Sequence, residues 1–378
     1  MKILEVNIDK SIDHDEFRKI VSFISEDITS YSMEEGKIIL RLVNEADNVQ
    51  IKNEVIRMAS KFVSTSELNR EVFVNKVERD YHSLYETKIV HVFENGMISL
   101  QKEALFLYKY FENIFRNIAI FIDDQCIEKS YPVILPINQY KKTGYLTNSP
   151  QYSMFCCSAC ENIQMLEQLD KYADSEAIEK YLNRPAYALS PSACFHTYLE
   201  YENQILDKNQ TVTFTQSVFR NEGRFNYTDF GRLRDYHVRE IVLLGNMEYV
   251  IEKRKKIVDQ IITFIKEINL CGDISIASDP FIMPKMQKFK KIQVTEASKY
   301  EMHLNYEKEQ KLSVASFNLH GTAFTHPFNI KIKECQEAVT GCVGFGLERW
   351  VLAFLKQYGV NVKNWPQKIK EVYYNEKR

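Results

Sequence analysis

Two short segments combine arginine, glutamate and glycine in patterns that suit the binding of a phosphorylated ligand. The first is Phe219-Arg-Asn-Glu-Gly-Arg224, which follows a stretch of strand-like alternation. A guanidinium at the end of a strand can fork onto a phosphate, and a nearby carboxylate can receive an amine or hold a metal. The second is Gly344-Phe-Gly-Leu-Glu-Arg349, where glycines let a ligand approach the backbone and a helix begins with an arginine in its first turn. Taken singly, each segment also fits a surface ion pair or a tight strand–helix junction.

The eight cysteines give weaker evidence for a functional site than these two segments do. Cys157-Ser-Ala-Cys160 is a CxxC pair, but no second CxxC and no HxxxH accompanies it, so we expect these residues in the core rather than in a structural zinc site. Cys194, Cys335 and Cys342 are scattered, and each alone is typical of a small buried apolar residue. None of the eight histidines pairs with a Ser or Cys in a nucleophile motif, so a hydrolase triad has no support.

The length and composition of the chain limit the class of protein to which these segments belong. The chain has 378 residues, enough for two or three domains, and its 49 Lys+Arg against 51 Asp+Glu give no general nucleic-acid signal. No apolar run approaches the ~18 residues needed to span a bilayer. The first ten residues lack an apolar signal segment, and the cysteines do not form a disulfide scaffold. We therefore expect a cytoplasmic protein without a membrane partner.

The chain divides into two predicted domains. Residues 1–85 read as a small α/β unit, and its first 80 residues carry 12 Lys+Arg against 16 Asp+Glu, a net charge of −4. Residues 86–378 read as an α+β catalytic domain with a largely antiparallel sheet. Helices are predicted at 101–120, 160–183 and 247–268, and strands at 131–135, 212–220, 241–244, 312–318 and 336–344.

The order of the segments resembles a known family. The helix and strand that end at Pro136, then Phe219-Arg-x-Glu222, then Gly344-x-Gly-x-x-Arg349 resemble motifs 1, 2 and 3 of class II aminoacyl-tRNA synthetases. Lys-Lys-Thr-Gly-Tyr-Leu (141–146) and the stretches around 297–303 and 316–318 narrow the resemblance to the seryl branch. Within it the chain is most similar to the amino acid:[carrier protein] ligases, relatives of the atypical archaeal seryl-tRNA synthetase that charge a phosphopantetheine thiol instead of tRNA. The similarity covers roughly residues 100–360.

The resemblance implies a zinc ion held by Cys194, Glu240 and Cys342. Two thiolates and a carboxylate leave one position open, which is the layout of a working site. In the family that position takes the amino group of the substrate, which zinc binds only when neutral, and it thereby orients the substrate carboxylate. By the same resemblance Asn318 belongs to the amino-acid pocket.

The resemblance also implies the nucleotide site. Arg220 would contact the α-phosphate of ATP and the attacking carboxylate, where charge builds during adenylate formation, and Arg349 would hold the γ-phosphate. Glu222 would lie on the adenine side, and Mg²⁺ would bridge the phosphates. The seryl branch places an adenine-stacking aromatic where this chain has Ile241, so Phe225 or Phe230 could take over the stacking. The residues implied to complete the pocket are Arg232, Leu233, Lys299, Ser313, Val314, Ala315 and Ser316.

The partners implied are ATP, a small amino acid, a second copy of the chain and a holo-carrier protein. Motif 1 forms the homodimer interface in class II enzymes. The densest basic run, Lys285, Lys288, Lys290 and Lys291, falls where the family places its carrier-binding insertion, and carrier proteins are generally acidic. A solvated helix face is the alternative interpretation of these lysines.

Three functions stay open on the sequence. The first is activation of glycine, alanine or serine as an aminoacyl-adenylate and its transfer to a carrier-protein thiol. The second is a seryl-type aminoacyl-tRNA synthetase. The acidic N-terminal domain and the absence of a basic tract argue against it, because phosphate neutralisation dominates tRNA affinity, so no tRNA partner is expected. The third is a non-catalytic paralogue, which would not need the full set of arginines and metal ligands.

Overall fold

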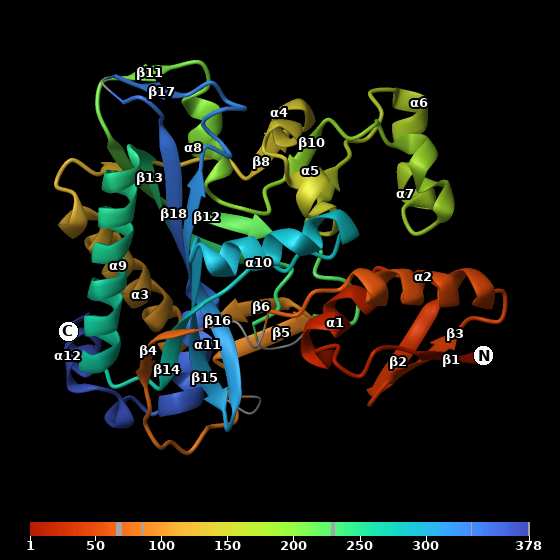
Figure 1. Cartoon of the computed structure of the whole chain (residues 1–378), viewed down its shortest axis with the longest axis horizontal. Helices are drawn as coiled ribbons and strands as arrows, with labels where there is room; N and C mark the ends of the chain where they lie inside the picture. The colour runs from red at the N-terminus through yellow and green to blue at the C-terminus, as the bar shows by residue number, and fades with distance from the viewer. Residues whose placement is uncertain (66–69, 85–86, 228–230, 334, 377–378) are drawn as a thin grey trace.

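The computed structural model describes residues 1–378 except 66–69, 85–86, 228–230, 334 and 377–378 (Figure 1). Its N-terminal domain is a three-stranded antiparallel sheet in the order β1-β3-β2, with two helices that begin at aspartates. Asp13 accepts from the backbone N–H of Glu16, and Asp47 accepts from those of Val49 and Gln50, so each satisfies free donors at a helix start. The elements are β1 (Lys2–Asn7), α1 (His14–Val21), β2 (Ile28–Glu34), β3 (Lys37–Leu42) and α2 (Asn48–Lys61).

An eight-stranded sheet forms the centre of the catalytic domain, in the order β4-β14-β15-β16-β18-β13-β12-β7. All neighbours are antiparallel except β12 and β7, which confirms the predicted α+β class. The strands are β4 (Glu71–Asn75), β7 (Ile127–Glu128), β12 (Gln210–Phe219), β13 (Asp235–Gly245), β14 (Gly272–Ile276), β15 (Lys299–Glu307), β16 (Gln310–Gly321) and β18 (Val339–Gly346).

One strand of the large sheet comes from the first 85 residues of the chain. Strand β4 pairs with β14 of the large sheet, with Phe73 opposite Ile274. Residues 71–75 therefore pair with the large sheet, although they lie within the range 1–85 predicted for the N-terminal domain. The pairing partner lies about 200 residues away in the sequence, so local pattern could not reveal it.

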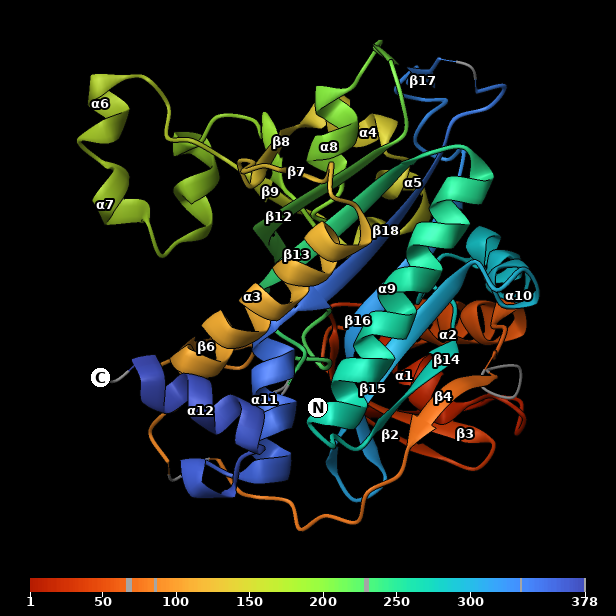
Figure 2. The same ribbon diagram turned by 90° about the vertical axis from the view of Figure 1, so that its left-hand side faces the viewer.

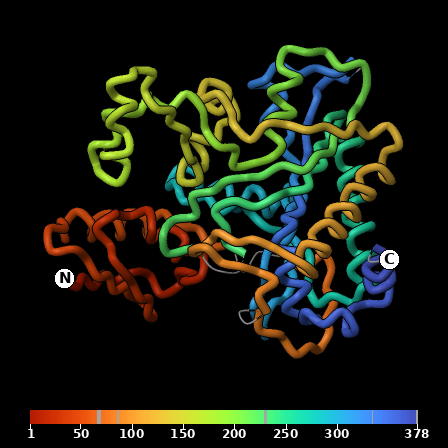
Figure 3. Tube along the Cα trace, turned by 180° about the vertical axis from the view of Figure 1, so that it is seen from behind, coloured from red at the N-terminus to blue at the C-terminus, as the bar shows by residue number. Residues whose placement is uncertain are grey.

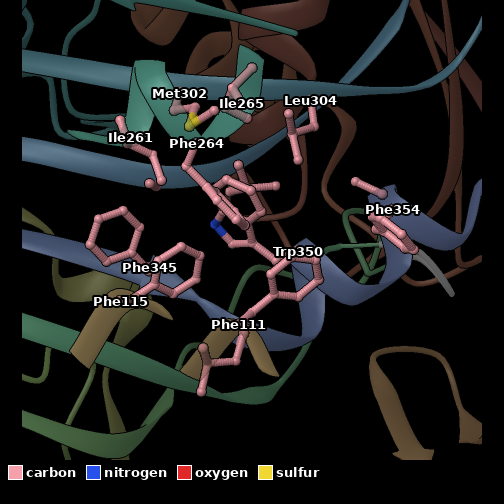
Figure 4. Close-up of a cluster of buried hydrophobic side chains, with 14 of the residues drawn as sticks. Phe111, Phe115, Ile261, Phe264, Ile265, Met302, Leu304, Phe345, Trp350 and Phe354 are labelled. Carbon is pink, nitrogen blue, oxygen red and sulfur yellow. The ribbon is translucent and has the colours of Figure 1, made fainter. Parts of the chain in front are cut away.

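Long helices cover one face of the sheet (Figure 2). They are α3 (Glu103–Ile122), α9 (Met247–Glu267) and α11 (Leu347–Tyr358), followed by η5 (Val362–Asn364) and α12 (Gln367–Glu376). An aromatic cluster fills the space between the helices and the sheet (Figure 4). Phe115 stacks on Phe345 with ring centroids 4.2 Å apart and lies 4.9 Å from the ring of Trp350, and none of the three is exposed.

The opposite face carries shorter elements. A three-stranded sheet in the order β8-β10-β9 lies there with α4, α5 and α8, and its buried residues form a second core. The elements of this region are β8 (Ile134–Pro136), α4 (Ile137–Lys142), α5 (Tyr145–Asn148), η2 (Pro150–Tyr152), β9 (Met154–Cys156), β10 (Tyr187–Leu189), α8 (Phe195–Glu200), β11 (Ile205–Leu206) and β17 (Lys331–Ile332).

The helix predicted for 160–183 is wrong. The chain instead makes three short helices, α6 (Ile163–Leu166), α7 (Leu169–Tyr172) and η3 (Glu176–Tyr181), which project from the body in Figure 1. Ile163 and Leu166 are exposed there, so no core face stabilises a longer helix. The CxxC pair begins this projection, and Cys157 is exposed rather than in the core. The remaining elements are β5 (Val90–Glu94), β6 (Met97–Leu100), η4 (Pro284–Met286) and α10 (Gln287–Thr295).

In the part of the chain that the structure describes, no helix combines the length and the apolar composition that crossing a bilayer would require.

The aromatic cluster generates a stability prediction. Phe115→Ala would remove a fully buried ring that contacts two others and leave a cavity, which costs about 3–5 kcal/mol of unfolding free energy. Urea unfolding of the purified chain measures this loss. Lys109→Ala, an exposed position on the same helix, is the control and should change stability by less than about 0.5 kcal/mol. Equal midpoints for the two variants would contradict the packing.

Candidate functional site

The two central strands present different chemistry on their two faces. β13 and β18 pair so that Glu240 is opposite Gly344 and Ile241 is opposite Val343. Because side chains alternate along a strand, Ile241 and Val343 enter the aromatic core while Glu240 points to the other face. A Cβ placed on Gly344 would lie 2.8 Å from Oε2 of Glu240, so glycine at this position makes room for the carboxylate.

Cys194, Glu240 and Cys342 form a cluster on that second face. One donor atom from each lies within 4.8 Å of the others, and all three residues are buried. They come from three distant segments: Cys194 immediately precedes α8, and the other two lie on β13 and β18. The structure thus brings together the three residues that the sequence analysis assigned to zinc.

Without a bound cation, ionisation of the Glu240 carboxyl and the Cys342 thiol is energetically unfavourable. Burial raises the pKa of Glu240 to about 7, although a hydrogen bond with Cys342 and the charge of Arg220 work in the opposite direction. A hydrogen bond with Cys194, together with burial, raises the pKa of Cys342 well above its ordinary value. A divalent cation would offset two of the three negative charges, so the donor set fits a thiolate-binding metal such as zinc.

Two further side chains border the cluster. Asn318 Nδ2 lies 3.6 Å from Cys342 Sγ and 3.2 Å from Ser316 Oγ, which places this predicted substrate residue at the cluster. His320, which the sequence analysis missed, has Nε2 3.7 Å from the same sulfur. Burial lowers the pKa of His320 to about 4, so its ring is neutral at neutral pH. Its position two residues after Asn318 on β16, and so on the same strand face, is the signal that could have found it.

The predicted motif 2 forms a hairpin at the end of β12 and β13. Arg220 Nε donates to the carbonyl of Pro191 at 2.9 Å, which joins this arginine to the segment that supplies Cys194. Glu222 is 6% exposed, and its Oε2 accepts from Arg232 Nη1 at 3.2 Å. Arg220 is close enough to Glu240 for its charge to lower the pKa of that carboxyl. The motif and the cluster are therefore neighbours.

Arg349 lies on the first turn of α11, as the third motif predicts. Its guanidinium lies 4.5 Å from the centroid of the Tyr236 ring, and Nη1 donates to the Ser313 carbonyl at 3.3 Å. Its buried Nε has no hydrogen-bond partner among the described residues, so this arginine retains an unused donor. Tyr236 is a buried aromatic that the sequence analysis did not assign to the site.

Several predicted nucleotide contacts are restricted by burial. Leu233 and Val314 have core side chains, as does Ala315, so only their backbone atoms can reach a ligand. Lys299 is buried and pairs with Asp279 at 2.7 Å and Glu301 at 2.9 Å. The positive charge of this lysine is already neutralised by two carboxylates, which disfavours direct binding of Lys299 to a phosphate.

Of the two residues proposed to replace the adenine-stacking ring, the structure describes only Phe225. Ile241 is fully buried in the core. Phe225 packs on the N-terminal domain, with its ring centroid 5.4 Å from that of Tyr31. Phe230 lies outside the described residues. The aromatic ring of Tyr236 lies beside Arg349, the predicted motif 3 arginine.

The basic run between α9 and β15 is not uniformly open to a partner. Lys285, Lys288 and Lys291 are exposed. Lys290 is 4% exposed, and its ammonium lies 3.5 Å from Glu16 and 3.3 Å from the carbonyl of Val63 in the N-terminal domain. The assignment of Lys290 to carrier-protein docking is therefore wrong, because this lysine joins the two domains.

Comparisons with known proteins agree with this geometry, although no protein-family model matches the chain. The type-2 serine–tRNA ligase of Methanococcus maripaludis is 27% identical over 278 residues, which are 68% of this chain and 54% of that protein. The type-2 serine–tRNA ligase of Methanocaldococcus jannaschii is 25% identical over 373 residues, 89% of this chain and 71% of that one. The chain thus spans about half the length of the first of these relatives.

Solved structures share the fold. The Methanopyrus kandleri seryl-tRNA synthetase, solved in complex with an Aquifex aeolicus tRNASec, matches 99% of this chain and 77% of its own, with a TM-score of 0.67 at 18% identity. The Pyrococcus horikoshii seryl-tRNA synthetase, solved with ATP, matches 74% of this chain and 57% of its own, with a TM-score of 0.53 at 12% identity. The fold and the sequence relatives of the chain described here show that it is class II aminoacyl-tRNA synthetase-like and related to the archaeal type-2 seryl-tRNA synthetases.

Proposed function

We propose that the chain uses ATP to activate a small α-amino acid, with serine as the first candidate, and passes the aminoacyl group to tRNA. One observation carries the proposal: the buried Cys194–Glu240–Cys342 cluster lies beside Arg220 in a chain whose relatives are serine–tRNA ligases. A class II fold alone would not favour this reaction, since the same fold can carry different functions. The combination of fold, donor set and arginines supports it.

In the proposed first step the substrate carboxylate attacks the α-phosphorus of ATP and pyrophosphate leaves. Arg220 is fixed by its bond to the Pro191 carbonyl, so its guanidinium is held in place to stabilise the charge that develops there. Arg349, with its unused buried Nε, would bind the terminal phosphates, and Mg²⁺ would arrive with the nucleotide. Tyr236 would offer its ring face to the adenine, and Glu222 and Arg232 would border it.

The cluster of Cys194, Glu240 and Cys342 would hold the amino-acid end. A zinc ion bound there supplies an open coordination position for a neutral amine. Asn318 would contact the same substrate, since its amide lies 3.6 Å from Cys342 Sγ. In the second step the acceptor attacks the carbonyl carbon of the adenylate and AMP leaves.

The acceptor separates two candidate functions. Transfer to tRNA is favoured by the relatives, and the match to the Methanocaldococcus protein covers 89% of this chain, more than the catalytic domain alone. Transfer to the thiol of a holo-carrier protein is the second candidate. It is favoured by the net charge of −4 over residues 1–80 and by the exposed lysines 285, 288 and 291. The complete set of arginines and cluster residues argues against a non-catalytic paralogue.

A homodimer remains part of the proposal. The motif 1 helix α3 ends in Ile120 and Phe121, which are 39% and 72% exposed, and Ile127 on the edge strand β7 is 38% exposed. Apolar side chains at this edge suit an interface between two copies of the chain.

The metal site is tested by measuring the zinc content of the purified chain rather than its activity. We expect about one zinc per purified chain, and Cys342→Ala should lose it because the variant removes a thiolate donor from a three-residue site. Cys157→Ala, at an exposed cysteine outside the cluster, is the control and should keep the metal. Absence of zinc from the parent protein, or its retention in both Cys194→Ala and Cys342→Ala, would show that the site is wrong.

Arg220→Ala tests the activation step. The variant should lower the rate of amino-acid-dependent ATP–pyrophosphate exchange by roughly 10²–10³, because it removes a fixed charge from the reacting phosphate. Zinc content should stay at the parental level. Arg184→Ala, at an exposed arginine that follows the projecting helices, should exchange at the parental rate. Exchange within a factor of two of the parent by the Arg220 variant would exclude this role.

The acceptor is tested directly. The parent chain, radiolabelled serine and ATP are incubated with tRNA or with a phosphopantetheinylated carrier protein, and glycine and alanine are assayed in parallel. We expect acid-precipitable label on tRNA and none on the carrier protein. A hydroxylamine-sensitive thioester on the carrier, with uncharged tRNA, would instead select the second candidate. Arg220→Ala should lose whichever product forms.

A further inference from the structure

The loop between β12 and β13 lies against the N-terminal domain. In Figure 3 the green segment that follows β12 reaches the red N-terminal domain. Gly223 adopts φ +85°, and a Cβ there would lie 2.6 Å from Cβ of Ser22 and 2.8 Å from the ring of Phe23. The loop backbone therefore approaches the end of α1 more closely than any residue type other than glycine at position 223 would permit.

Arg224 makes the most extensive contact across the interface between this loop and the N-terminal domain, which we call the seam. Its guanidinium donates to four backbone carbonyls, those of Ser22 (3.2 Å), Ser25 (2.7 Å), Glu26 (3.3 Å) and Ile28 (2.7 Å). The last carbonyls of a helix and of the turn after it lack partners in the helix, and their partial negative charge favours a cation. A guanidinium has enough donors in one plane to satisfy several of them at once.

The residues after Arg224 continue the contact. Phe225 donates its N–H to Ser22 Oγ at 3.1 Å. The side chain of Asn226 donates both to the Lys19 carbonyl at 3.3 Å and to the Glu222 carbonyl at 2.7 Å. One amide group thus ties the N-terminal domain to the backbone of a predicted ATP-binding residue.

Hydrogen bonds within the loop carry this attachment to the site. Tyr227 OH accepts from the N–H of Glu222 at 3.1 Å and donates to the carbonyl of Arg220 at 3.1 Å. Glu222 in turn accepts from Arg232 at 3.2 Å. The conformation of residues 220–227 therefore fixes where the Glu222 carboxylate and the Arg232 guanidinium lie.

We propose that Arg224 is a positioning residue, through which the N-terminal domain holds the loop so that Glu222 and Arg232 are in place for ATP. A loop released from the domain would have to be ordered each time the nucleotide binds, which costs affinity. The inference rests on the proposed function only in taking ATP as the ligand of this loop. It gives the N-terminal domain a role in nucleotide binding that does not depend on which acceptor is used.

A second set of contacts keeps the domain docked when Arg224 is replaced. Lys290 Nζ lies 3.5 Å from Glu16, and Gln287 Oε1 accepts from the N–H of Val63 at 3.2 Å. Both come from α10, and their partners Glu16 and Val63 are not among the residues that accept from Arg224. Substitution of Arg224 should therefore loosen the loop without releasing the whole domain.

The test measures ATP binding by calorimetry on the zinc-loaded full chain. Arg224→Ala should raise the dissociation constant for ATP about 10- to 100-fold, whereas the Michaelis constant for serine and the zinc content should stay within a factor of two of the parent. Arg224→Lys should recover part of the loss, since an ammonium can reach one or two of the four carbonyls. Arg57→Ala, at an exposed arginine of α2, is the matched control in the same domain and should bind ATP like the parent.

Ser22→Leu separates positioning from a direct contact. Ser22 is 6% exposed at the seam, so a larger side chain there displaces the loop from the N-terminal side and leaves Arg224 intact. We expect a loss of ATP affinity like that of Arg224→Ala. A loss in Arg224→Ala alone would mean that Arg224 acts on the nucleotide directly, and parental affinity in both variants would overturn the inference. A parent chain that does not bind ATP would instead overturn the proposed function.

Discussion

The alternation of side chains along β13 and β18 is the constraint on which both the core and the candidate site depend. On one face Phe345 stacks on Phe115, whose ring also contacts Trp350, while Cys342 and Glu240 occupy the other face. A shift of one residue in strand register would exchange these faces and place a thiol in the aromatic cluster. The aromatic packing therefore does more than stabilise the fold, because it also fixes which atoms can meet at the cluster.

The same alternation explains what the sequence could predict. Period-two patterns gave the strands at 212–220 and 312–318, and the helical period gave 247–268, which is observed at Met247–Glu267. Arg349 follows from a strand–helix junction that is visible locally. Cys194, Glu240 and Cys342 do not, because they lie on three distant segments and only a family resemblance could select them.

Two departures from the sequence-based predictions have the same physical reason, namely contacts between distant segments. Strand β4 belongs to the large sheet through its pairing with β14, and Lys290 is buried through its contact with Glu16. Neither partner is close in sequence. The helix predicted at 160–183 is the opposite case, since no distant surface covers Ile163 and the segment breaks into short turns.

The contacts between the domains also change how the charge of the N-terminal domain should be interpreted. The net charge of −4 over residues 1–80 counts Glu16, which is engaged with Lys290 of the catalytic domain, and the carbonyls beyond α1 are covered by the Arg224 guanidinium. Part of the negative character therefore faces the seam rather than solvent. Since phosphate binding responds to the local distribution of charge and not to the sum over a domain, the acidic composition is a weaker argument against a tRNA acceptor than it is on the sequence alone.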